Sequence, residues 1–70
     1  MNSTENLLGT TAGRILEYLS KEQECDIIKL KFTLKLNNSL LFLGLGWLAR
    51  EDKIVIIQSK NTYLIKLKKM

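Results

Sequence analysis

The sequence predicts a small α+β domain, in which three helices are followed by a β-hairpin. Two stripes of apolar residues with the period of a helix lie at residues 12–19 and 41–48. Two segments rich in β-branched residues follow near the C-terminal end, with four polar residues between them. The 70 residues are enough for one domain. Its core is expected to be small, because a chain of this length buries only about 60% of its unfolded surface.

The first helix is expected to follow a flexible tail. Residues 1–8 begin with a polar stretch that we expect to fray, and residues 9–70 are predicted to fold as one domain. Thr10 and Thr11 offer a helix cap, and the helix is predicted to end near Lys21. Its apolar positions follow the spacing i, i+3, i+4 and i+7, with Ala12, Ile15, Leu16 and Leu19.

The segment from residue 25 to 36 fits two periods. Every second residue is apolar, which indicates a strand, through Ile28, Leu30, Phe32, Leu34 and Leu36. A helix would instead use Ile27, Leu30 and Leu34 as its stripe, with Asp26 as the cap. The local pattern favours the strand, but the tight connection at residues 37–39 into another helix favours a helix-turn-helix, and we adopt that interpretation. A short strand at residues 24–27 stays open.

The third helix is predicted over residues 39–50, capped by Asn38 or Ser39. One side carries the leucines that are expected to pack in the core, Leu41, Leu45 and Leu48. The other side also carries large apolar groups, and it consists of Phe42, Leu43, Gly46, Trp47 and Arg50. A domain this small lacks the layers to bury both sides of a helix, so this second side is expected to meet a partner. The alternative is that Trp47 packs under the hairpin or on the first helix.

Glycines inside predicted helices indicate close packing. Gly44 and Gly46 each cost about 0.5–1 kcal/mol relative to alanine, so we expect another group to pack close to this helix backbone. Gly9 and Gly13 have a G-x-x-x-G spacing, which indicates a helix start and a close packing point rather than a membrane dimer motif.

A β-hairpin completes the predicted fold. Its strands cover residues 54–58 and 63–67, and residues 59–62 form the turn, in which Asn61 tolerates a positive φ. The order helix, short strand, helix, helix, hairpin is that of a winged helix-turn-helix domain, in which the hairpin is the wing.

The run Gly-Leu-Gly-Trp-Leu-Ala-Arg-Glu-Asp-Lys-Ile at residues 44–54 resembles a family of small bacterial winged helix-turn-helix proteins of unknown function. Residues 11–15 with Tyr18 and Leu19 look like the first helix of that family, and residues 34–36 are similar to its second. Ile28 departs from the many winged helices that place a Ser or Thr cap there. The resemblance covers residues 9–67 and implies a winged-helix fold, a homodimer and a DNA-related role, without a ligand or catalytic residue.

The residue types argue against an enzyme. The chain has no histidine, and its single cysteine, Cys25, lacks an imidazole to activate it and is expected to be a buried small residue. Glu51 and Asp52 are adjacent on a helix and do not face each other. The match of Gly44-x-Gly46-x-x-Ala49 to a dinucleotide fingerprint lies within a helix, where that motif does not work. We expect no catalytic residue, no cofactor, no metal and no small-molecule substrate.

Compartment and membrane association are inferred from composition. A single cysteine fits a reducing compartment, and residues 1–6 do not have the features of a signal peptide. The longest apolar run, residues 40–49, is half of the roughly 20 residues that a membrane span needs. We therefore expect a cytoplasmic protein without a membrane partner.

Two functions remain open. The net charge is +4, and a basic domain permits weak, salt-sensitive binding of double-stranded DNA. The candidate contacts are Lys29, Lys31, Lys35, Asn37, Asn38, Ser39, Arg50, Lys60 and Asn61. The alternative is a protein-interaction or dimerisation module that does not read DNA, with its interface at Phe42, Leu43, Gly46 and Trp47. The fold favours the first hypothesis, which we place ahead, and the apolar side chains favour the second.

Overall fold

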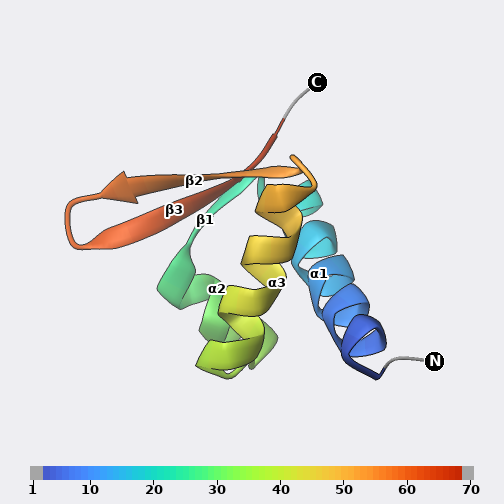
Figure 1. The fold of residues 1–70 in the computed structure, drawn as a ribbon. Coiled ribbons are helices and arrows are strands. Elements are labelled where there is room, and N and C mark those ends of the chain that lie inside the picture. The colour runs from blue at the N-terminus through green and yellow to red at the C-terminus, as the bar shows by residue number, and fades with distance from the viewer. Residues whose placement is uncertain (1–2, 69–70) are drawn as a thin grey trace.

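Three helices and a three-stranded antiparallel sheet form the domain (Figure 1). The computed structural model describes residues 3–68, with side chains from residue 9 onward. The elements in chain order are α1 (Ser3–Glu22), β1 (Glu24–Asp26), α2 (Ile27–Leu34), α3 (Asn38–Arg50), β2 (Ile54–Ser59) and β3 (Thr62–Leu67). The predicted α+β winged helix-turn-helix fold is confirmed, including the short strand that the sequence left open.

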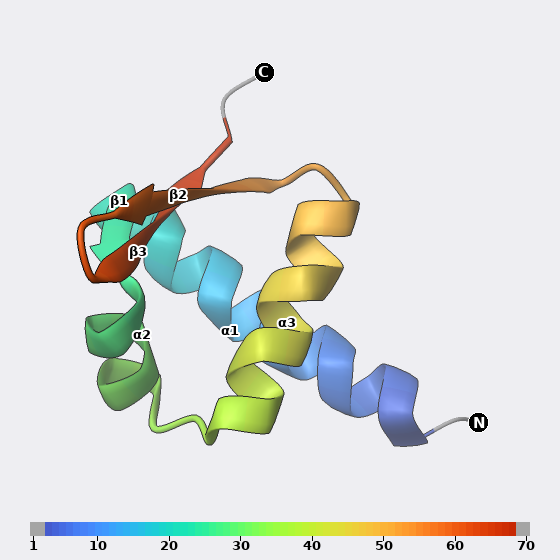
Figure 2. The same cartoon turned by 60° about the vertical axis from the view of Figure 1, so that its left-hand side comes forward.

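The sheet has the order β1-β3-β2, so that the last strand of the chain lies between the other two. Ile65 of β3 pairs with Cys25 on one side and with Ile56 on the other, both in antiparallel register. The β2–β3 hairpin projects away from α1, and the two views agree on this (Figures 1 and 2). This projecting hairpin is the wing.

The core lies between the helices and the inner side of the sheet, and α3 crosses α1 and packs against it (Figure 2). The predicted core side of α3 is confirmed, because Leu41, Leu45 and Leu48 are all buried. Cys25 is also buried, as expected for a small apolar residue. The full set of buried apolar residues is Ala12, Ile15, Leu19, Cys25, Leu30, Leu36, Leu41, Leu45, Leu48, Ile54 and Ile65.

The start of α1 differs from the prediction. The helix begins at Ser3, so residues 3–8 of the expected tail are helical, and residues 1–2 lie outside the described part of the chain. Thr11 therefore cannot be a cap, because its N–H and C=O lie well inside the helix. Its side chain is buried and contacts the position of Gly44 on α3. A threonine that suits a helix start is used here for packing between helices.

The helical interpretation of residues 27–34 is confirmed, with Asp26 as the N-cap. The Ile28 N–H donates to Asp26 Oδ1 over 2.8 Å. Leu30 is fully buried while Phe32 is 71% exposed, although both belong to the same period-2 pattern in the sequence. The helix ends at Lys35, whose left-handed backbone (φ 55°) lets its N–H reach the carbonyls of Lys31 and Phe32.

Two turn predictions are wrong in detail. The cap of α3 is Asn37, not Asn38 or Ser39, because Asn37 Oδ1 accepts the Leu40 N–H over 2.8 Å. In the hairpin turn the positive φ (49°) belongs to Lys60 and not to Asn61. The register pairs Ser59 with Thr62, which leaves a two-residue loop whose first residue takes the left-handed conformation.

The glycine prediction is confirmed at one of four positions. A Cβ on Gly44 would lie 3.0 Å from Thr11 Cγ2 and 3.1 Å from Ile15 Cδ1, so α1 and α3 approach closely at this residue. A Cβ on Gly46, Gly9 or Gly13 would meet none of the described residues within 4 Å, and the expected close packing there is wrong for contacts with that part of the chain.

The Asp26 carboxylate makes the stability of the fold depend on pH in the acid range. The Thr62 hydroxyl and then the Ile28 N–H hold the pKa of Asp26 below its ordinary value. Thr62 Oγ1 has no hydrogen bond of ordinary geometry among residues 9–68, so the bond from Ile28 is the firmer contact. Because the folded pKa is lower than the unfolded one, the stabilisation is present above the unfolded pKa and is lost as the pH falls through the folded value.

Replacing Asp26 by asparagine is expected to flatten the acid limb of the stability curve, since asparagine caps a helix but does not titrate. Melting temperatures of both proteins, measured from neutral pH to about pH 2.5, should diverge below the ordinary aspartate pKa of about 3.9, with the wild type losing more. Parallel curves over that range would contradict this role for Asp26.

Candidate interaction surfaces

The solvent side of α3 is apolar over most of its length. Phe42 is 58% exposed, Leu43 is 54% exposed and Trp47 is 42% exposed. Together with Gly46 and Arg50 these residues line one shallow hollow on the helix. We call Phe42, Leu43, Gly46 and Trp47 the apolar α3 face. The structure brings together the four residues that the sequence proposed as a protein interface.

A groove between α3 and the wing continues this surface. Ile56 on β2 and Tyr63 on β3 are exposed and face the helix across it. The groove shares Phe42 and Gly46 with the hollow on α3, so the apolar surface runs without a break from Trp47 to Tyr63. The lining of this groove, the α3–wing groove, is Ile27, Phe42, Leu45, Gly46, Ile56 and Tyr63.

Sequence reasoning did not place Ile56 and Tyr63 in a surface. The signal was present, because residues 54–57 are all apolar, whereas a strand with one face in water alternates apolar and polar residues. Val55 and Ile57, on the opposite side of β2, are exposed as well.

The candidate nucleic-acid contacts fall at three separate places. Those on α2 and its end are lysines, those at the start of α3 are polar amides and a hydroxyl, and those at the wing tip are Lys60 and Asn61. All are exposed except Lys31, which is half-buried with its Nζ 5.8 Å from the centre of the Phe32 ring. Arg50 lies apart from them, at the far end of the hollow beside Trp47.

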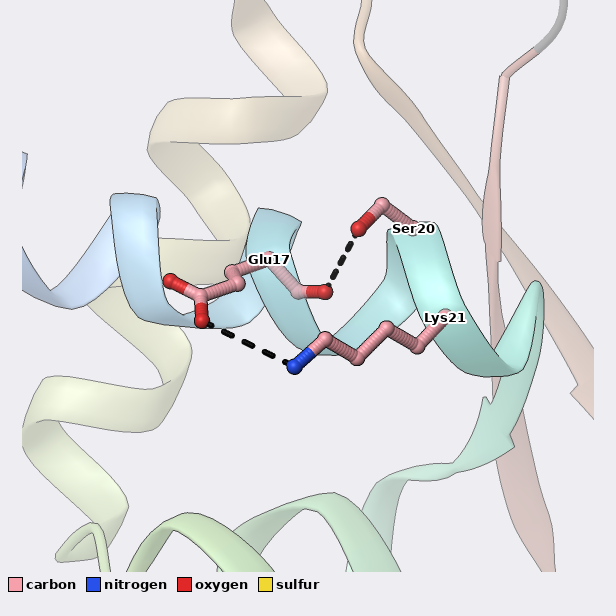
Figure 3. Close-up of polar contacts among 3 residues, drawn as sticks. All are labelled: Glu17, Ser20 and Lys21. Atoms are coloured by element: carbon pink, nitrogen blue, oxygen red, sulfur yellow. Dashed lines mark hydrogen bonds and ion pairs between the residues drawn. The ribbon is translucent and has the colours of Figure 1, made fainter.

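Other basic side chains are engaged with carboxylates. Lys68 Nζ lies 2.6 Å from Asp52 Oδ1. On α1, Lys21 Nζ lies 3.9 Å from Glu17 Oε1, while the Ser20 hydroxyl donates to the Glu17 carbonyl over 2.7 Å (Figure 3). Both partners of the Lys21 pair are exposed, so the pair adds little stability. The Glu17 carboxylate nevertheless compensates the positive charge of Lys21 on this part of α1.

Cys25 is buried and lies beside a tyrosine hydroxyl and a backbone carbonyl. The Cys25 Sγ lies 3.8 Å from the Tyr18 hydroxyl and 3.2 Å from the carbonyl of Asp26. The contact with the Cys25 thiol, followed by burial, raises the pKa of Tyr18. Among the side chains of residues 9–68 no three His, Cys, Asp or Glu gather in a way that could hold a metal ion. No helix within residues 3–68 is long and apolar enough to cross a membrane.

A helix-turn-helix packed on a first helix, with a projecting two-stranded wing, defines the winged helix-turn-helix class. The chain belongs to the winged helix-turn-helix domain family DUF2582, which matches residues 1–67. It is also similar to the uncharacterized protein MJ1608 of Methanocaldococcus jannaschii, with 35% identity over 63 residues, covering 87% of this chain and 90% of that protein. The winged helix-turn-helix family inferred from residues 44–54 is thereby confirmed, while its restriction to bacteria and the diagnostic value of that run stay predictions.

Proposed function

We propose that this protein is a small nucleic-acid-binding module of the winged-helix class, that it acts as a homodimer in the cytoplasm, and that it is not an enzyme. The observation that carries the proposal is the distribution of charge over the fold. The helix-turn-helix segment from Ile27 to Arg50 contains four basic residues and no acidic one, and the wing from Ile54 to Leu67 contains two and none. These are the parts of a winged helix that lie closest to DNA.

The bound nucleic acid would be held mainly through its phosphates. Lys29 and Lys35 on the α2 side and Lys60 at the wing tip present exposed ammonium groups. Asn38 and Ser39 stand at the N-terminal end of α3, the part of a recognition helix that reaches base edges. The middle of α3 offers one side-chain hydrogen-bond donor, the indole N–H of Trp47, and otherwise apolar groups, so the affinity should depend weakly on sequence.

Binding to random-sequence duplex DNA is expected to be weak and to fall steeply with salt. With about four phosphate contacts from one chain, the affinity should drop about 100-fold between about 50 and 200 mM salt, and it should drop more steeply if both chains of the dimer contact the duplex. Fluorescence anisotropy of a labelled duplex at a series of salt concentrations measures this slope. Lys60→Gln should reduce the slope by about one contact.

The matched control is Lys21→Gln, which removes the same charge from the compensated surface of α1. It should leave both affinity and slope unchanged. A lack of binding at the lowest salt, or equal losses from the two variants, would overturn the proposed DNA contact.

The second candidate function is a protein-interaction or dimerisation module that does not bind DNA. The observation in its favour is the apolar α3 face, which occupies the place where a recognition helix would present polar side chains. Self-association that persists while the DNA titration shows no binding would select this function.

A further inference from the structure

We propose that the apolar α3 face binds a second copy of this chain. The two α3 helices pack antiparallel about a two-fold axis that lies between the helices, level with the midpoint of residues 44 and 45. The inference deepens the homodimer of the proposed function by assigning its surface and geometry, and it does not depend on DNA binding. In other winged helices the corresponding helix inserts into DNA. In this dimer the central part of that helix would contact the other subunit instead.

The first argument comes from the two glycines in α3. Each carries the cost of a glycine inside a helix, about 0.5–1 kcal/mol relative to alanine. Gly44 has a reason within the chain, because Thr11 and Ile15 of α1 occupy the space where its side chain would lie. Gly46 has none among residues 9–68, since none of their atoms lies within 4 Å of its Cβ position. A close neighbour from outside the chain supplies the missing reason.

The second argument is that the face is complementary to itself. In an antiparallel pair about the stated axis, residues equally far from the midpoint oppose each other. Leu43 of one copy then opposes Gly46 of the other, so a large side chain fills the open space above the glycine. Phe42 and Trp47 are five residues apart, about 140° around the helix, so they flank the Leu43–Gly46 contacts on opposite sides. Aromatic side chains of this kind are enriched in interfaces. At the ends Arg50 opposes Ser39, so charged and polar groups lie at the rim of the contact.

The third argument is area. Phe42, Leu43 and Trp47 with Ile56 and Tyr63 expose roughly 500 Å² per copy, judged from the area that such side chains bury when fully covered. That is about a tenth of the 5082 Å² surface of the chain, the share that a stable interface covers on a small protein. A standard interface buries about 800 Å² per partner, and the polar rim around these residues supplies the remainder.

Nucleic acid is a poorer occupant of the same surface. Base edges and phosphates require hydrogen-bond donors and positive charge, and along the apolar α3 face these are limited to the indole N–H of Trp47 and to Arg50 at its end. An unrelated protein would not require that the face match itself residue by residue. The observations therefore favour a second copy.

Sedimentation equilibrium of the wild type and Gly46→Leu tests the interface. The wild type should dimerise, and Gly46→Leu should dissociate at least about tenfold more easily, because the new side chain collides with Leu43 of the second copy in both symmetric contacts. The double variant Leu43→Ala/Gly46→Leu should recover most of the loss, since it exchanges the large and the small residue across the axis.

The matched control is Gly13→Leu, which makes the same change at an open helical glycine of α1 and should leave dimerisation unchanged. Circular dichroism of each variant establishes that it is folded. A monomeric wild type would overturn this inference together with the homodimer. A wild-type dimer that Gly46→Leu leaves intact, or that the double variant does not recover, would overturn the α3 geometry alone. Dissociation of the dimer by duplex DNA would assign the face to DNA instead.

Discussion

Replacing Leu30 by alanine is expected to lower the free energy of unfolding by about 3 kcal/mol, within the range for a fully buried leucine. Leu30 is the buried residue of α2, an eight-residue helix that cannot be stable by itself. Small domains have total stabilities of about 5 kcal/mol or little more, so the variant should be partly unfolded near physiological temperature. Urea denaturation followed by circular dichroism measures the loss.

The control for Leu30 is Phe32→Ala on the same helix. Phe32 is the larger residue, but it is 71% exposed, and its removal should change the stability by less than about 0.5 kcal/mol. If residues 28–36 formed the strand that their alternation suggests, Leu30 and Phe32 would share one face and respond alike. Equal losses from both variants would therefore contradict the helical assignment as well as the prediction.

Replacing Gly44 by leucine is expected to destabilise the domain by about 3 kcal/mol through overpacking. Even the first carbon of the new side chain would stand 3.0 Å from Thr11 Cγ2 and 3.1 Å from Ile15 Cδ1. Both of these residues are buried and have no free space to move into, so α1 and α3 must separate. Thermal unfolding at low protein concentration measures the effect without a contribution from self-association.

The counterpart is Gly13→Leu, which should raise stability by about 0.5–1 kcal/mol, because it replaces an open helical glycine with a good helix former. Opposite signs for the two glycines are the expected result. A stable Gly44→Leu variant would mean that the close approach of α1 and α3 is not as the structure has it.

The two proposals can hold together because they use mostly different parts of the molecule. The apolar α3 face is assigned to the second copy, whereas the lysines lie on α2, at its C-terminal end and at the wing tip. Ser39 and Arg50, at the rim of the α3 contact, are the candidate DNA contacts that both proposals share. A dimer formed in this way carries two wings and two copies of α2, which doubles the number of phosphate contacts. Its binding would be electrostatic and would read little sequence.

Most of the fold is predictable from the sequence because its signals are local. The leucine period of α3 places Leu41, Leu45 and Leu48 in the core, and the β-branched strands with a polar turn give the wing. The helix-turn-helix needed more than local pattern, since the alternation in residues 28–36 favours a strand. The helix forms because Asp26 caps it and because Leu30, with the half-buried Ile27 and Leu34, packs on the rest of the domain.

The misplaced details depend on packing and on strand register, which residue composition does not show. Thr11 has the composition of a cap, but it lies inside a longer helix and packs near Gly44. Lys60 takes the positive φ that asparagine accepts more readily, because the register of β2 and β3 leaves only two residues for the turn. The α3–wing groove exists only where Ile56 and Tyr63 meet Phe42 in space.

The sequence by itself determined the order of the elements, the core side of α3 and the four residues of the apolar α3 face, since these depend on periods of two and 3.6 residues along the chain. Only the tertiary structure decided which glycine lies against a neighbouring helix and which one is open. Gly44 and Gly46 are two residues apart and carry the same local cost, but they point to different sides of α3. One side is filled by α1, and the other is exposed because no other element of the described chain packs against it.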